Sequence, residues 1–412
     1  MEASEADTMM REALQARRAG RASEARAMFE AIIDRNPDNA AALNSLGLLL
    51  LESGQAGEAI ARFSRATEVD PKAAPLWLNL AEACRAAGRV DEEIGALDRA
   101  LAIDPYLLPA MLKKAQALER ADRPDESAAA YRNLLAASPD TPALPEAIRS
   151  ALAHGREVVR AAGERRAAQL EAPLRQVYEA YADSDLHRVR AYADHSTGRR
   201  KIYQPKPTGG HFPFIPAPEY FDRSLFPWFD RLEAATDLIR GELLSIWAED
   251  EAGFQPYVAF DPTQPVNQWV ELNHSPRWSA WFFWRDGVRQ DAHCARCPET
   301  AALLDSLPLI DIPGKAPSVM FSILAPKTRI PAHHGTTNVR VTVHLPLVVP
   351  AGCGFRVGGE TREWREGEAW AFDDTIEHEA WNDSDRPRAI LILDAWNPFL
   401  TEAERAAVRV IG

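Results

Sequence analysis

The sequence predicts an α+β multidomain protein, in which an all-α repeat domain precedes a domain built mainly from β-strands. The chain has 412 residues, enough for two or three domains of roughly 100 to 200 residues each. Prolines recur every 34 residues in the first third, at Pro37, Pro71, Pro105 and Pro139, and each closes an alanine-rich amphipathic segment. Beyond about residue 250, short segments rich in Trp, Phe, Val and Ile alternate with Gly, Pro and Asp, which is typical of a strand sandwich or barrel.

Each 34-residue interval contains two predicted helices. In the interval that ends at Pro71, the first helix carries Leu46 and Gly47, and the second carries Ala59 and Phe63. The small residues let two helices approach closely, and the large apolar residues fill the groove of the next pair. These positions and their period resemble the tetratricopeptide repeat (TPR). We therefore expect about four repeats over residues 6–140, stacked as a solenoid.

The solenoid offers a concave groove for a peptide or a partner protein. The alternative is a packing or dimerisation module whose groove is occluded. No position in the repeats combines a nucleophile, a base and an orienting group, so we assign no chemistry there. We expect residues 1–140 to form the solenoid, residues 141–190 a helical cap or linker, and residues 191–412 the β domain, with one further helix from Trp228 to Trp247.

Composition and charge narrow the class of partner. The net charge of −13 opposes non-specific binding to nucleic acid or anionic lipid. No stretch approaches the roughly 18 consecutive apolar residues of a membrane span, and the acidic N-terminus lacks the pattern of a secretory signal. Four scattered cysteines, Cys84, Cys294, Cys297 and Cys353, are too few for a disulfide framework. We expect a cytoplasmic protein with no nucleic-acid or membrane partner; its oligomeric state is left open.

Two histidine-containing segments carry the candidate chemistry. His333 precedes one predicted strand and His378 lies beside another, so two neutral imidazoles could hold one iron, zinc or copper ion. The usual non-haem iron pattern adds a carboxylate two residues after the first histidine, where this chain has Gly335. The residues alone leave open whether these histidines are ligands or structural. His334 competes with His333, but adjacent strand residues face opposite ways, and the spacing to Gly335 favours His333.

Polar residues on two further predicted strands fall on single faces. Arg340, Thr342 and His344 alternate with valines and leucine, so at a period of two their side chains share one face. Arg388 enters a strand that is otherwise mainly apolar. A buried arginine is costly unless a carboxylate meets it.

The stretch from Ser322 to Trp396 resembles the aspartyl/asparaginyl β-hydroxylase family, which consists of iron(II)- and 2-oxoglutarate-dependent dioxygenases with a double-stranded β-helix (jelly-roll, cupin-like) fold. The likeness rests on His333-His334-Gly335 and on the motifs at Phe372–Trp381 and Asp394–Pro398. That family uses His-x-Gly with a distant histidine and no carboxylate ligand, so the glycine fits its pattern. The resemblance is clear over about residues 250–400.

The resemblance implies a role for each matching residue. His333 and His378 would bind iron(II) and, together with Arg388, form the catalytic set. Arg388 and Ser322 would hold the distal carboxylate of 2-oxoglutarate, and His344 would contact the carboxylate nearer the metal.

The resemblance also implies a substrate contact. Arg340 matches a family arginine that faces the acidic or amide side chain of the substrate. Thr342 stands where the family often has a second arginine, so the identity of the substrate stays open.

The implied activity is hydroxylation of the β-carbon of Asp or Asn in a polypeptide, coupled to conversion of 2-oxoglutarate to succinate and carbon dioxide. The repeats would help to recruit that polypeptide substrate. Two alternatives remain. One is an adaptor that keeps the fold without turnover, and the other is a hydroxylase of a lipid or a small metabolite.

Two weaker signals accompany the main motifs. Cys294 and Cys297 form a Cys-x-x-Cys, which could be half a zinc site, a reversible disulfide or ordinary packing. Asp373, Asp374 and Glu377 crowd the second histidine and could supply a third metal ligand or a hydrogen bond to its imidazole. Turn capping is the alternative for these three carboxylates.

Overall fold

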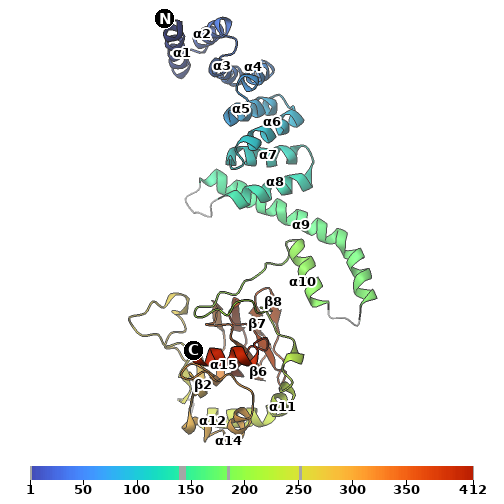
Figure 1. The fold of residues 1–412 in the computed structure, drawn as a ribbon, viewed down its shortest axis with the longest axis vertical. Coiled ribbons are helices and arrows are strands. Elements are labelled where there is room, and N and C mark those ends of the chain that lie inside the picture. Colours follow the sequence, from blue (N-terminus) through green and yellow to red (C-terminus); the bar gives the residue numbers. More distant parts are fainter. Residues whose placement is uncertain (1, 139–144, 183–185, 250–252, 412) are drawn as a thin grey trace. The chain divides into compact units, whose positions relative to one another are not determined.

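The computed structural model describes residues 2–138, 145–182, 186–249 and 253–411, and the chain separates into two compact units, Met1–Arg199 and Arg200–Gly412 (Figure 1). The division between Arg199 and Arg200 lies a little further along the chain than the boundary predicted near residue 190. Pro139 and the predicted boundary at residue 140 lie outside the described residues. None of the described helices combines the length and the apolar character that a membrane span requires.

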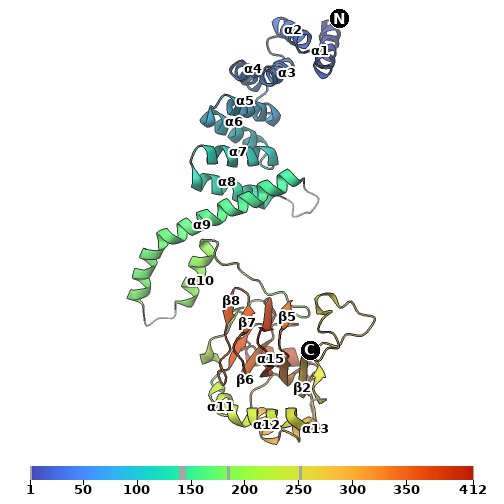
Figure 2. The same ribbon diagram turned by 180° about the vertical axis from the view of Figure 1, so that it is seen from behind.

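The first unit is helical. Its described residues form α1 (Glu2–Arg18), α2 (Ala22–Arg35), α3 (Ala40–Glu52), α4 (Ala56–Val69), α5 (Ala74–Ala86), α6 (Val90–Ile103), α7 (Leu108–Arg120), α8 (Pro124–Ala137), α9 (Glu146–Ala180) and α10 (His187–Ser196). Helices α1 to α8 pack as four successive pairs, which Figures 1 and 2 show as a stack. The predicted helical-repeat architecture is confirmed.

Small residues set the spacing of the repeat helices. A Cβ added to Gly47 on α3 would lie 2.7 Å from the Phe63 ring on α4, so only glycine lets these two helices pack this closely. Gly54 adopts a φ of +78° in the turn that joins them, a conformation that other residues reach only with strain. Helix α9 then packs on α8, where Gly155 lies under the Tyr131 ring.

The second unit consists of two antiparallel sheets and short helices. The larger sheet has the order β1-β2-β4-β11-β6-β9 with β3 paired to β2, and the smaller has the order β5-β10-β7-β8. The strands of the larger sheet are β1 (Gln255–Pro256), β2 (Trp278–Arg285), β3 (Val288–Arg289), β4 (Val319–Leu324), β6 (Arg340–Val348), β9 (Trp370–Phe372) and β11 (Arg388–Trp396). Those of the smaller sheet are β5 (Thr328–His333), β7 (Cys353–Val357), β8 (Glu360–Arg362) and β10 (His378–Asn382).

Helices cover one side of the larger sheet. They are α11 (Phe229–Ala234), α12 (Thr236–Glu249), α13 (Asp291–Cys294) and α14 (Pro298–Asp305), while α15 (Glu402–Ile411) ends the unit and short 3-10 turns lie at Arg223–Leu225 and Asn267–Trp269. Figure 1 shows α11, α12 and α14 together beside the strands, and Figure 2 shows α11, α12 and α13 there. The single helix expected from Trp228 to Trp247 is interrupted at Ala235, where the Thr236 hydroxyl donates to the Glu233 carbonyl.

The two faces of the larger sheet have different partners. Val343 and Leu391 point to the helices and join their apolar side chains in one core. On the opposite face, Ile390 and Phe372 pack with Phe355 of the smaller sheet. The period-two pattern therefore places the polar residues of β6 and β11 between the sheets. The predicted order of a helical-repeat domain followed by a β domain is confirmed, whereas its jelly-roll description stays a prediction.

Candidate active site

The two predicted metal ligands lie side by side. His333 ends β5, His378 begins β10, and these two residues are direct partners in the antiparallel ladder. Their ring centroids are 4.0 Å apart. Sequence analysis could not determine this pairing, because it depends on the register between β5 and β10, which are separated in the chain by the four strands β6 to β9.

Backbone hydrogen bonds orient both imidazoles. Nδ1 of His333 lies 2.8 Å from the carbonyl oxygen of Pro331, and Nδ1 of His378 lies 3.0 Å from that of Ile376. Because a carbonyl oxygen can only accept, both Nδ1 atoms carry the proton and both Nε2 atoms keep a lone pair. Burial, followed by the charge of His378, lowers the pKa of His333 to about 3, and burial lowers that of His378 to about 4. Both rings are therefore in the neutral form that binds metals.

The glycine of the His-x-Gly motif has a steric cause. A Cβ on Gly335 would lie 2.2 Å from the carboxyl carbon of Asp374, and the Gly335 amide donates to the Asp374 carbonyl oxygen at 2.6 Å. The position that the Cβ of an Asp or Glu ligand would occupy at residue 335 is thus filled by the carboxylate of Asp374, which comes from another loop. No group of three or more His, Cys, Asp or Glu side chains arranged to hold a metal occurs among the described residues.

Arg388 is a buried cation with no carboxylate partner among the described residues. It begins β11 and is 1% exposed, and its Nε and Nη1 have no hydrogen-bond partner in the described part of the chain. Its guanidinium carbon lies 4.5 Å from the centroid of the Trp364 ring. Burial lowers the pKa of Arg388 to about 9. An anion that enters this cavity would satisfy both the charge and the unpaired N–H groups.

The remaining predicted co-substrate residues line the same cavity. Ser322 on β4 is fully buried and accepts a hydrogen bond from Nε1 of Trp278 at 3.0 Å. His344 on β6 lies beside Phe355, with ring centroids 5.0 Å apart and ring planes tilted by 58°, and its Nδ1 has no partner among the described residues. Burial, followed by the charge of Arg388, lowers the pKa of His344 well below its ordinary value.

All six predicted site residues meet at one cavity of about 1340 Å³ between the sheets. They are Ser322, His333, Arg340, His344, His378 and Arg388. The sequence analysis assigned no site role to Trp364, which faces the guanidinium of Arg388, or to Trp278, which donates to Ser322. No sequence motif marks Trp364. The role of Trp278 could be recognised only once the pairing of β2 with β4 was known.

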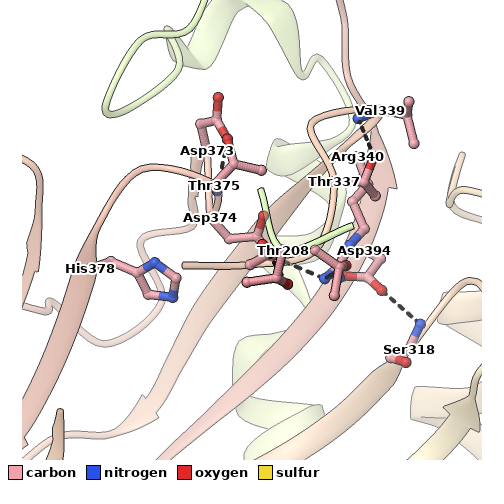
Figure 3. Close-up of polar contacts among 12 residues, drawn as sticks. Thr208, Ser318, Thr337, Val339, Arg340, Asp373, Asp374, Thr375, His378 and Asp394 are labelled. Carbon is pink, nitrogen blue, oxygen red and sulfur yellow. Dashed lines mark hydrogen bonds and ion pairs between the residues drawn. The ribbon is translucent and has the colours of Figure 1, made fainter. Parts of the chain in front are cut away.

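Arg340 is already paired. Its Nη2 lies 3.0 Å from Asp374 Oδ2, and its Nη1 forms an ion pair with Asp394 Oδ1. Figure 3 shows the guanidinium with one carboxylate on either side. Asp394 also accepts a hydrogen bond from the Ser318 amide at 2.8 Å. Asp374 therefore pairs with an arginine rather than capping a turn, while Asp373 does form a turn through Thr375.

A segment before the first helix of the unit borders the histidine motif. The amide of Thr208 donates to the Gly335 carbonyl at 2.9 Å, and that of Gly209 donates to the Thr336 carbonyl at 2.8 Å. A Cβ on Gly209 would lie 2.8 Å from the same Thr336 oxygen. The stretch from Thr208 to Gly210 thus runs along one wall of the cavity.

The Cys-x-x-Cys lies away from this cavity. Cys294 and Cys297 are buried in the core between the helices and the larger sheet, and both are free thiols. Burial raises the pKa of Cys297 to about 12. Of the alternatives considered for this pair, the structure supports ordinary packing.

Comparison with known proteins agrees with this geometry. A family model described as aspartyl/asparaginyl beta-hydroxylase matches residues 233–398, and TPR models match residues 10–61, 46–107 and 109–141. The rat aspartate beta-hydroxylase domain-containing protein 2 is 31% identical over 245 residues, which cover 58% of this chain and 68% of the rat protein. The chain belongs to the aspartyl/asparaginyl β-hydroxylase family.

Other members of the family differ in size and substrate. Human aspartyl/asparaginyl beta-hydroxylase is 34% identical over 182 residues, which cover 44% of this chain but 22% of the human protein. The chain thus spans less than a quarter of that relative. The ornithine lipid ester-linked acyl 2-hydroxylase of Rhizobium tropici is 30% identical over 190 residues, covering 45% of this chain and 63% of that protein. The names of these relatives describe hydroxylases.

Proposed function

We propose that this protein is an iron(II)- and 2-oxoglutarate-dependent dioxygenase that hydroxylates the β-carbon of Asp or Asn in a peptide or protein. The observation that carries the proposal is Arg388. A guanidinium that is 1% exposed and has no carboxylate partner among the described residues is stable in a fold only if a ligand meets it. That guanidinium lines the same cavity as two neutral imidazoles.

The residues present fit a metal ion with two protein ligands. His333 and His378 would hold iron(II) through Nε2, since both Nδ1 atoms are engaged by backbone carbonyls. These hydrogen bonds fix the ring orientation before any metal arrives. The Asp374 carboxylate beside Gly335 is paired with Arg340 through Oδ2.

The residues also fit a dicarboxylate co-substrate. Arg388 and the hydroxyl of Ser322 would receive the distal carboxylate, and the unpartnered Nδ1 of His344 is available to the carboxylate nearer the metal. Iron(II) with 2-oxoglutarate supplies dioxygen activation, and 2-oxoglutarate is oxidised to succinate and carbon dioxide. The protein contributes position, charge neutralisation and an apolar wall, formed in part by Phe355 and Ile390, that excludes water.

The TPR unit would recruit the polypeptide that is modified. Tetratricopeptide repeats are protein-interaction modules, and four helix pairs give an extended surface for a peptide. Hydroxylation of a lipid acyl chain is the second candidate, and the name of the Rhizobium relative supports it. A non-catalytic adaptor is the third.

Removing one metal ligand tests the proposal. His378→Ala should abolish Mn(II) binding, measured by electron paramagnetic resonance, and succinate formation, measured by NMR with iron(II) and 2-oxoglutarate. His334→Ala is the matched control, because His334 adjoins the pair in the chain but it is His333 that is the ladder partner of His378; we expect this variant to retain Mn(II) binding. Wild-type protein that binds both iron and 2-oxoglutarate but never forms succinate, even with candidate peptides, would favour the adaptor.

A further inference from the structure

The substrate side of the cavity contains an arginine that is not available to a substrate carboxylate. Arg340 is paired with both Asp374 and Asp394, and the side chains of these three residues are 19%, 8% and 4% exposed. Nη2 of Arg340 also lies 3.4 Å from the Thr336 hydroxyl. One guanidinium thus faces two carboxylates, and this cluster carries a net negative charge (Figure 3).

No other cation of the cavity replaces Arg340. The charged side chains that line the described cavity are Asp286, Lys315, Arg340, Asp374, Arg388 and Asp394. Lys315 and Asp286 are exposed, so water solvates both charges. Arg388 is assigned to the co-substrate by the proposed function. The buried wall therefore offers a substrate no unpaired positive charge.

Thr342 lies between the charged cluster and the co-substrate residues. It is two residues along β6 from both Arg340 and His344, pairs with Asp394 across the ladder, and lines the cavity. It is 8% exposed, and its hydroxyl makes no hydrogen bond with another described side chain or carbonyl. A free hydroxyl can donate to one atom and accept from another, which suits a carboxamide.

From this arrangement we infer that the substrate group beside the iron site is uncharged, so that this protein hydroxylates asparagine in preference to aspartate. The inference rests on the proposed function and specifies its substrate. An aspartate carboxylate would be desolvated next to two carboxylates, or would have to displace one of them from Arg340. An asparagine amide avoids both of these costs. An apolar acyl chain would leave the Thr342 hydroxyl without a polar partner.

Two matched peptide libraries test the preference. Each is a nonapeptide with four randomised positions on either side of a central residue, Asn in one library and Asp in the other, and neither has Asn or Asp elsewhere. The full chain is incubated with iron(II) and 2-oxoglutarate, and the added oxygen is detected by mass spectrometry. We expect at least a tenfold preference for the Asn library. Equal turnover, or faster turnover of the Asp library, would overturn the inference.

A single substitution should reverse the preference. Thr342→Arg adds a cation beside Asp374 and Asp394 and so cancels the net negative charge of this cluster; turnover and retention should shift at least tenfold towards the Asp library. Thr342→Val is the matched control, because it removes the hydroxyl without adding charge, and it should not favour Asp. Retention of each library on immobilised protein with Mn(II) and 2-oxoglutarate gives a readout that needs no turnover. A Thr342→Arg protein with unchanged retention would contradict the charge argument.

The remaining outcomes separate this inference from the proposed function. If Mn(II) and 2-oxoglutarate bind but neither library is retained or modified, the asparagine assignment is wrong while the co-substrate site stands. Modification of acyl chains in phosphatidylcholine vesicles, with neither library modified, would assign the uncharged site to lipid and overturn the inference. Absence of 2-oxoglutarate binding would reject the proposed function itself.

Discussion

Replacing Arg388 with methionine should stabilise the protein and remove its response to 2-oxoglutarate. The wild-type guanidinium is 1% exposed, and two of its nitrogens lack partners in the described structure. Each unsatisfied buried donor costs about 1–3 kcal/mol. Against this, the substitution loses the contact with the Trp364 ring, worth about 0.5–2 kcal/mol. We expect a net gain of about 1–4 kcal/mol in the free energy of unfolding without ligand.

The assay is thermal or urea unfolding followed by tryptophan fluorescence. Of the 11 tryptophans, only Trp77 precedes residue 200, so the signal reports on the second unit. A gain of 1 kcal/mol should raise Tm by about 2–4 °C in a unit of this size. With 2-oxoglutarate at about 100 times its Kd, the wild type should gain about 2.7 kcal/mol, and Arg388→Met should gain none. 2-Oxoglutarate should therefore narrow the difference in free energy of unfolding between Arg388→Met and the wild type, or reverse the sign of that difference.

Arg356→Met is the matched control. Arg356 lies on β7 and is paired with Glu377 at 3.0 Å and with Glu379 at 2.6 Å. Its removal takes away the ion pair of Glu377 and one of the two ion pairs of Glu379, which keeps Arg329 at 2.9 Å. The substitution should therefore lower Tm, and it should leave the response to 2-oxoglutarate in place. An Arg388→Met protein that is less stable than wild type without ligand, or that is stabilised by 2-oxoglutarate as strongly as wild type, would refute the reasoning.

Three further predictions follow from particular contacts. Gly335→Ala should cost about 1–3 kcal/mol of stability and most of the succinate formation, since its Cβ would lie 2.2 Å from a carboxyl carbon, whereas Gly210→Ala, with nothing within 4 Å, should change stability by less than about 0.5 kcal/mol. In the helical unit, Gly47→Ala should lower the free energy of unfolding, followed by circular dichroism, because the added Cβ would lie 2.7 Å from a phenylalanine ring. Gly95→Ala, where the added Cβ meets open space, should raise the free energy of unfolding by about 0.5–1 kcal/mol. The stability advantage of Arg388→Met should be complete below pH 9 and shrink above it. Burial lowers the folded-state pKa of this arginine to about 9 from an ordinary 12.5, so the unfolded wild type binds more protons in that window and wild-type stability rises with pH. Urea midpoints of both proteins between pH 8 and 10.5 check this, and a constant gap would contradict it.

Much of the fold could be predicted from local pattern. The 34-residue period sets the repeat helices because each pair must bury the same small and large apolar positions against its neighbours. The period-two alternation on β6 and β11 correctly divided polar from apolar faces, since strand side chains alternate regardless of the partner strand. The break at Ala235 was missed because apolar residues continue at helical spacing through it.

For the candidate site, the sequence predicted the types of residue but not their arrangement in space. A histidine pair with a glycine, and an arginine in an apolar strand, were visible in the sequence because they violate the pattern around them. Their meeting in one cavity depends on the pairing of β5 with β10 and of β4 with β11, which are contacts between distant segments.

The sequence by itself determined where helices and strands form, which faces are apolar and which polar side chains interrupt them, because these properties depend on neighbours a few residues away. Only the tertiary structure decided which partner each charged side chain within an apolar strand has. Arg340 and Arg388 both begin strands of the same sheet, and both are largely buried. One is neutralised by two aspartates and the other has no carboxylate, since pairing across a cavity is set by three-dimensional packing and desolvation.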